Sequence, residues 1–289
     1  MTKQIQLIKL YCAVCQHYNS TIVRNMQRLS NNFCPKFTDE ECITIYLFGI
    51  SEQKYTVKAI YEFIEDYYAE WFPDMPTYQN FNRRICNLAD AFRQIAELLL
   101  SKQEITYDDM TYMIDSMPIV VANEKRSEDA KTAGEMCNKG YCGSKKMYYY
   151  GVKLHALVKK QEHALPKLSL AWISPASEHD LSEAKHNLDN CRNMDVFGDK
   201  AYGDIEWNRF MSEYNNVNFT TPVKLEKGQA RLNSADKLYN SLLSSIRQPI
   251  ESFFNWIQEK TKIQSASKVR SSNGLTAFVF ARLAAISLF

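Results

Sequence analysis

The chain has 289 residues, of which 45% are hydrophobic and 24% charged, and its formal net charge is +2. This composition is typical of a globular protein long enough for two domains. The sequence contains no uncharged apolar stretch of about 18 residues, so no membrane span is expected. No signal peptide is expected at the N-terminus. The sequence therefore predicts a cytoplasmic protein with reduced cysteines, and Cys12 and Cys15 lack the second close pair that a zinc site needs.

Positive charge is concentrated in two parts of the chain. Residues 221–289 contain 10 Lys and Arg against 4 Asp and Glu, and residues 131–160 contain seven lysines against one acid. Such stretches are typical of surfaces that bind nucleic-acid phosphates, although solvated lysine faces have the same composition.

The first hundred residues have a helical pattern. Apolar side chains recur at helical spacing over 60–72 and again over 81–98, separated by a turn that contains Pro73 and Pro76. Arg83 and Arg84 fall early on the second helix, where the recognition helix of a helix-turn-helix meets DNA. An ordinary helical hairpin explains the same pattern.

The polar segment 101–109 predicts a domain boundary, with a helical, DNA-binding region over 1–100 and a second domain over 101–289. In the second domain, strands are expected to alternate with helices, which indicates an α/β domain with a mixed sheet. The expected strands cover 112–121 (bent at Pro118), 148–160, 168–173, a short run ending at Asp199, and 217–221; the expected helices cover 179–188, 205–214 and the chain from 222 to its end.

Three acidic residues are the main candidates for chemistry. Asp115 and Asp199 follow short apolar runs, and Glu251 lies on an amphipathic helix on which Pro249 fits the first turn. Carboxylates that converge repel one another unless a cation neutralises them, and Mg²⁺ prefers such oxygen ligands. Two such ions can clamp the attacking and leaving oxygens of a phosphodiester, which predicts cutting and joining of nucleic acid. Taken singly, each acid is also explained by a turn, a cap or an ion pair with Arg247.

An ordered set of motifs connects the three acids. The motifs are Ile-Asp-Ser around Asp115, Lys-Gly-Tyr-Cys-Gly-Ser-Lys-Lys at 139–146, Tyr-Gly-Val-Lys-Leu-His at 150–155, Pro-Ala-Ser-Glu-His-Asp at 175–180, Gly-Asp-Lys-Ala-Tyr at 198–202, Arg-x-x-x-Glu at 247–251, and Phe-Asn-Arg-Arg at 81–84 in the N-terminal region. This ordered pattern resembles the catalytic domain of bacterial insertion-sequence transposases of the DDE class, most closely the insertion-sequence family numbered nine-eighty-two.

The resemblance implies a ribonuclease-H-like mixed sheet with flanking helices, preceded by an all-helical N-terminal domain. It implies that Asp115, Asp199 and Glu251 are the catalytic residues and hold two Mg²⁺ ions, with Mn²⁺ as a substitute. The implied DNA contacts are Arg83, Arg84, Lys145, Lys146, Lys153, His155, Arg247 and Lys262; structural ion pairs or a core histidine are the alternative for Lys153, His155 and Arg247.

The implied partners are double-stranded DNA, as the element's terminal inverted repeats and the target, and a second copy of the chain in a nucleoid-associated complex. Relatives often carry a tyrosine and a lysine where this chain has Ser244 and Gln258, and Lys262 is the candidate replacement for the lysine. Two alternatives stay open: a DNA-binding descendant that no longer moves DNA, and a plain metal-dependent nuclease.

Overall fold

The computed structural model describes residues 2–22, 35–101, 110–143, 145–225 and 228–289. The chain forms two compact units. Unit 1 comprises Met1–Lys102, Lys131–Glu135 and Ile257–Phe289, and unit 2 comprises Gln103–Ala130 and Met136–Trp256. The segment 102–109, on which the predicted boundary falls, lies outside the described residues.

Within its described residues, unit 1 has only helical elements. Its α-helices are α1 (Lys3–His17), α3 (Asp39–Ser51), α4 (Val57–Tyr68), α5 (Tyr78–Asn87), α6 (Ala89–Ser101), the end of α9 (Ser234–Thr261) and α10 (Ser272–Ala285); the short turns are η1 (Tyr18–Ile22), η2 (Ala69–Trp71) and η5 (Ile286–Leu288).

Two of these helices, α3 and α10, form the centre of unit 1. Both are apolar around most of their circumference, which is the pattern of a buried helix, and almost every residue from Cys42 to Ile50 and from Leu275 to Ala285 is buried. A capping box between Thr38 and Glu41 starts α3 by satisfying two backbone N–H groups. Since α10 packs on α3, α5 and α6, residues 257–289 group with the N-terminal helices, whereas the sequence analysis assigned them to the second domain.

The predicted helix pair is present as α4 and α5, but the stripe over 81–98 belongs to two helices. The chain leaves helical geometry at Leu88, whose N–H donates to the carbonyls of both Arg84 and Ile85 and so closes α5 with a tighter turn. The apolar spacing continues across this break because both helices face the same core.

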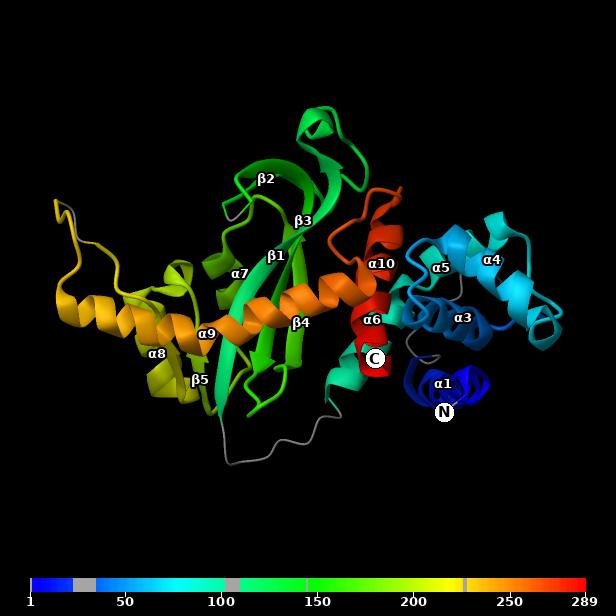
Figure 1. Cartoon of the computed structure of the whole chain (residues 1–289), viewed down its shortest axis with the longest axis horizontal. Helices are drawn as coiled ribbons and strands as arrows, with labels where there is room; N and C mark the ends of the chain where they lie inside the picture. Colours follow the sequence, from blue (N-terminus) through cyan, green and yellow to red (C-terminus); the bar gives the residue numbers. More distant parts are fainter. Residues whose placement is uncertain (1, 23–34, 102–109, 144, 226–227) are drawn as a thin grey trace. The chain divides into compact units, whose positions relative to one another are not determined.

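Unit 2 is an α/β unit with a mixed six-stranded sheet (Figure 1). The strands run in the order β2-β3-β1-β5-β6, with β4 also paired to β3; β3 is antiparallel to β1, β2 and β4, while β1, β5 and β6 are parallel. The strands are β1 (Thr111–Asn123), β2 (Asn138–Cys142), β3 (Met147–Lys159), β4 (Lys167–Pro175), β5 (Met194–Phe197) and β6 (Val217–Thr220).

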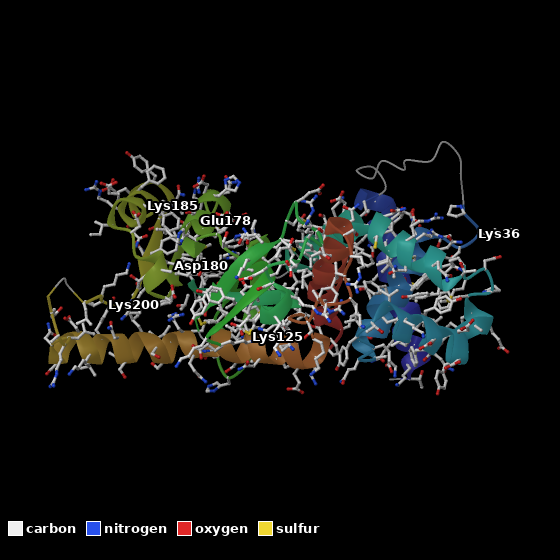
Figure 2. All side chains as sticks on the ribbon, turned by 90° about the horizontal axis from the view of Figure 1, so that it is seen from above. Lys36, Lys125, Glu178, Asp180, Lys185 and Lys200 are labelled. Atoms are coloured by element: carbon white, nitrogen blue, oxygen red, sulfur yellow. The ribbon has the colours of Figure 1, made fainter. Side chains whose placement is uncertain are left out.

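Helices cover both faces of this sheet. The helices α7 (Asp180–Asn187) and α8 (Ile205–Asn215) pack on one face over a core that includes Ile114, Trp172 and Val196. On the other face, α9 crosses the strands, as Figure 1 shows; Figure 2 views the same helix from above. The short turns η3 (Glu124–Arg126) and η4 (Lys200–Tyr202) follow β1 and β5. In the described part of the chain, no helix is long and apolar enough to cross a membrane.

One strand was missed and two local predictions were wrong. The strand β2 was not predicted, because its five residues contain a glycine and no apolar alternation. The irregularity in β1 lies between Val120 and Ala122, and Pro118 stays in register opposite Lys153. Pro249 lies inside α9, which begins 15 residues earlier at Ser234, so Glu251 is not in the first helical turn and gains nothing from the helix dipole.

Candidate functional site

The pairing of two adjacent parallel strands, β1 and β5, brings Asp115 and Asp199 close together. Met113 is the partner of Phe197 in the β1–β5 pairing, and each aspartate lies two residues further along its own strand direction. The negative charge of Asp199 accordingly acts on the Asp115 carboxyl. Asp199 also caps the η4 turn, where its Oδ1 accepts the Ala201 N–H at 2.7 Å.

Asp115 is a half-buried carboxyl whose pKa stays raised despite the positive charge of Arg247 nearby. Burial raises its pKa to about 6, and the negative charges of Asp199 and Asp180 add to this rise. The Ser116 N–H, which donates to Oδ1 at 2.8 Å, and the Arg247 guanidinium oppose it. Arg247 comes from α9, and its Nη2 lies 3.5 Å from the second carboxylate oxygen. The arginine thus supplies positive charge at the position where the sequence predicts a metal ion.

Asp180 is a third carboxylate at this site that the sequence analysis did not assign. It begins α7 and is labelled with Glu178 in Figure 2. Its Oδ1 accepts the Lys153 ammonium at 2.9 Å and lies 4.0 Å from Nδ1 of His155. The only sequence signal was the His-Asp pair that ends the 175–180 motif, and an N-terminal helix position is the usual explanation of such an aspartate.

The Tyr202 hydroxyl is within electrostatic reach of all three aspartates. The side chain is fully buried, and burial together with the charges of Asp180, Asp115 and Asp199 raises the pKa of its hydroxyl far above the usual range. Gly198 makes room for this ring, since a Cβ there would lie 2.8 Å from a Tyr202 ring carbon. The strand end that carries Asp199 is therefore held against a rigid aromatic side chain.

Glu251 is exposed on α9, one turn beyond Arg247. Residues four apart share a helix face, so the Arg247–Asp115 contact places Glu251 on the side of α9 that faces β1. Among the described residues, no three His, Cys, Asp or Glu side chains are grouped closely enough to hold a metal ion. The donors themselves are carboxylate oxygens, which fit Mg²⁺ or Mn²⁺.

The predicted DNA contacts have different surroundings. Lys153 is largely occupied, since it also donates to the Glu178 carbonyl at 2.7 Å. His155 is fully buried: its Nε2 is 2.8 Å from the Ser174 hydroxyl and its ring is stacked on Trp172. Burial lowers the pKa of His155 to about 4, so the ring is neutral at pH 7. This is the core histidine of the alternative interpretation, and we assign it no DNA contact.

Arg84 and Arg83 also differ. The Arg84 guanidinium donates to Asp39 and to the Phe37 carbonyl, while Arg83 is exposed. Lys145 and Lys146 are exposed in the β2–β3 connection. Lys262 follows the last residue of α9, so it is not on the helix face assigned to it, and its ammonium lies 5.7 Å from the centre of the Tyr55 ring.

A groove in unit 2 is lined by Asp180 and by Ala201, whose N–H binds the Asp199 carboxylate. Its volume is about 610 Å³, and its walls come from the β2–β3 hairpin, the segment between β4 and α7, and the η4 turn. The lining includes Tyr141, Tyr148, Lys153, Glu178, Asp180 and Ala201.

A mixed sheet with flanking helices, and with carboxylates on two adjacent parallel strands, is compatible with the nuclease fold of DDE enzymes. A family model described as "Transposase DDE domain" matches residues 106–288, which is more than half of the chain. The chain belongs to this transposase family, so its substrate is DNA and its general activity is that of a nuclease and strand transferase. No curated protein and no solved structure gave a match. The finer assignment to the family numbered nine-eighty-two stays a prediction.

Proposed function

We propose that this chain cleaves DNA at the ends of an insertion sequence and joins the freed 3′ hydroxyl to target DNA. One observation carries the proposal: Asp115 and Asp199 each lie two residues after the paired Met113 and Phe197 on parallel strands. Arg247 of α9 contacts Asp115. The family match supports the same activity class.

The strand order supports a ribonuclease-H-like assignment for unit 2. Three antiparallel pairings made by β3 adjoin the parallel set β1, β5 and β6, and the first acid lies on the central strand β1. The acidic residues then come from β1, from the end of β5 and from a late helix, as the resemblance implies. Active sites of open sheets commonly lie at the carboxyl ends of parallel strands.

Asp115, Asp199 and Glu251 are proposed to hold two Mg²⁺ ions, with Mn²⁺ as a substitute. When bound, the ions supply positive charge to the attacking and leaving oxygens of the phosphodiester. Arg247 neutralises Asp115 and is available to a phosphate once other positive charge replaces it there. Asp180 orients Lys153 at the groove wall, where the ammonium is near the path of the DNA backbone.

We propose that the α4–α5 pair recognises the sequence of the element's ends. The basic residues near the C-terminus are proposed to bind DNA without sequence preference. Arg83 is exposed early on α5 and is suited to base edges, whereas Arg84 is engaged with Asp39. Lys145, Lys146 and Lys262 are proposed to contact phosphates as point charges. A homodimer in the complex with the terminal inverted repeats, near the nucleoid, completes the proposal.

The test uses a plasmid that carries the coding region with its flanking DNA. The wild-type protein with Mg²⁺ should cut at short inverted repeats and join the ends to a second plasmid. Asp199→Asn should lower cleavage at least a hundredfold, about 3 kcal/mol, with end binding retained. Asp195→Asn is the matched control, because Asp195 is exposed on the same strand and accepts a hydrogen bond from Asn218.

Three outcomes separate the alternatives. Cleavage near the wild-type level in Asp199→Asn excludes this residue as a ligand. Cleavage without joining favours a plain nuclease. Binding of the ends without either reaction, in the wild-type protein, favours a DNA-binding descendant.

A further inference from the structure

Two tyrosines of the β2–β3 hairpin form an exposed aromatic pair at the groove. Tyr141 is opposite Tyr148 in the strand register, their ring centres are 4.9 Å apart, and they are 52% and 49% exposed. The Lys139 ammonium lies 5.2 Å from the centre of the Tyr148 ring and 2.8 Å from Glu128. Large aromatic faces on a surface that also carries positive charge are typical of single-stranded nucleic-acid contacts.

The hairpin is fixed to the segment between β4 and α7, which also lines the groove. The Asn138 amide donates to the Ser177 hydroxyl at 2.6 Å, and its oxygen accepts the Ser177 N–H at 2.8 Å. A Cβ on Gly140 would lie 2.3 Å from the Ala176 carbonyl oxygen, so only glycine permits this close approach. The tyrosine pair therefore has a defined position relative to the groove.

The groove connects this pair with the acidic residues. It is lined by both tyrosines and also by Lys153, Asp180 and Ala201. The Ala201 N–H holds the Asp199 carboxylate at 2.7 Å. A volume of about 610 Å³ falls within the roughly 300–1,000 Å³ of ligand pockets, which suits one nucleotide.

We propose that Tyr141 and Tyr148 stack on an unpaired DNA base next to the cleavage position. The proposal rests on the proposed function, since it takes the strand in the groove to be the strand that is cut. A duplex buries the faces of its internal bases, so stacking on this pair requires a base that has left the helix. Lys139 and Lys153 then lie where adjacent phosphates need positive charge.

A structural role for the pair is the competing explanation, because facing aromatic residues stabilise antiparallel strands. The two explanations differ in which DNA form they affect. Loss of hairpin stability should weaken the binding of single-stranded and duplex DNA alike, whereas loss of stacking should weaken only the single-stranded form.

The experiment measures binding of a short oligonucleotide that contains 2-aminopurine, as a single strand and as a duplex. The full-length chain carries Asp199→Asn, so that binding is read without cleavage. The wild-type tyrosines should quench the fluorescence of the single strand. Tyr141→Ala with Tyr148→Ala should remove the quenching and weaken single-strand binding at least fivefold, with less than a twofold change for the duplex.

Two control pairs keep the test decisive. Tyr141→Phe with Tyr148→Phe retains the ring faces and should retain quenching. Phe210→Ala with Tyr214→Ala removes a second exposed pair, on α8 with ring centres also 4.9 Å apart, and should change neither form. Equal weakening of both DNA forms, or unchanged quenching in the alanine pair, would overturn the stacking proposal. Either result leaves the cleavage assay of the proposed function unaffected.

Discussion

Asp115 and Asp199 are neighbours because each lies two residues beyond the paired Met113 and Phe197 on parallel strands. Paired parallel strands run side by side in the same direction, so two aspartates at equal distances from a shared pair lie next to each other. Their mutual repulsion is visible in the raised pKa of Asp115, after the larger contribution of burial. A proton or a nearby cation relieves such repulsion, and Arg247 is a nearby cation in this structure.

Replacing Glu251 tests whether α9 supplies the third ligand. Glu251→Gln should weaken Mg²⁺ binding at least tenfold, because a neutral amide keeps the shape but loses the charge that holds the cation. Isothermal titration of the purified chain with MgCl₂ and MnCl₂ gives the affinity and the number of ions.

Glu259→Gln is the control, since Glu259 is an exposed carboxylate on the same helix. Unchanged affinity in Glu251→Gln, with a tenfold loss in Asp180→Asn, would assign the third carboxylate to Asp180.

Replacing Arg247 tests its role as the charge that neutralises Asp115. Arg247→Ala should destabilise the metal-free protein by about 1–3 kcal/mol, because a half-buried carboxyl loses its partner. Added Mg²⁺ should then raise the melting temperature more than it does for the wild type. Arg247→Lys keeps the charge and should lie between the two, as measured by thermal denaturation with and without MgCl₂. The same melting temperature for Arg247→Ala and the wild type would contradict this role.

Local patterns predicted most of the strands and helices of unit 2, because alternation and helical spacing depend only on which face is buried. The sequence also indicated Asp115, Asp199 and Glu251 through their motifs. It did not predict Asp180 at the site or the ion pair of Arg84 with Asp39, since both depend on segments distant in sequence. The start of the helix that carries Glu251 was predicted wrongly at Pro249, because proline is more common in a first helical turn than in a helix interior. In the structure, α9 continues through Pro249.

The two adjacent arginines of α5 should behave differently when replaced. Arg84 neutralises Asp39, which is buried and also accepts the Tyr18 hydroxyl at 2.6 Å. Arg84→Ala should therefore cost about 3 kcal/mol of stability, because it leaves a buried charge unpaired. Arg83→Ala should change stability by less than about 0.5 kcal/mol and should lower the preference for end DNA over random DNA. Urea denaturation and a binding titration measure the two effects; a stable Arg84→Ala protein would refute the structural role.

The buried histidine predicts how stability changes with pH. The pKa of His155 is lowered to about 4 by burial in the folded protein, against about 6.5 in the unfolded chain. Between these values the unfolded state binds a proton that the folded state does not. Stability is therefore complete above pH 6.5 and falls by about 1.4 kcal/mol per unit as the pH decreases towards 4.

His155→Gln removes this titration while it keeps a side chain that can bond to Ser174. Urea denaturation at pH 7.5, 6.5 and 5.5 should show a decline in the wild type that is shallower in the variant, because the remaining acids titrate in both proteins. The difference between the two curves should reach about 1 kcal/mol at pH 5.5. Parallel curves over this range would mean that the ring takes up its proton without unfolding, and that its burial does not keep it neutral.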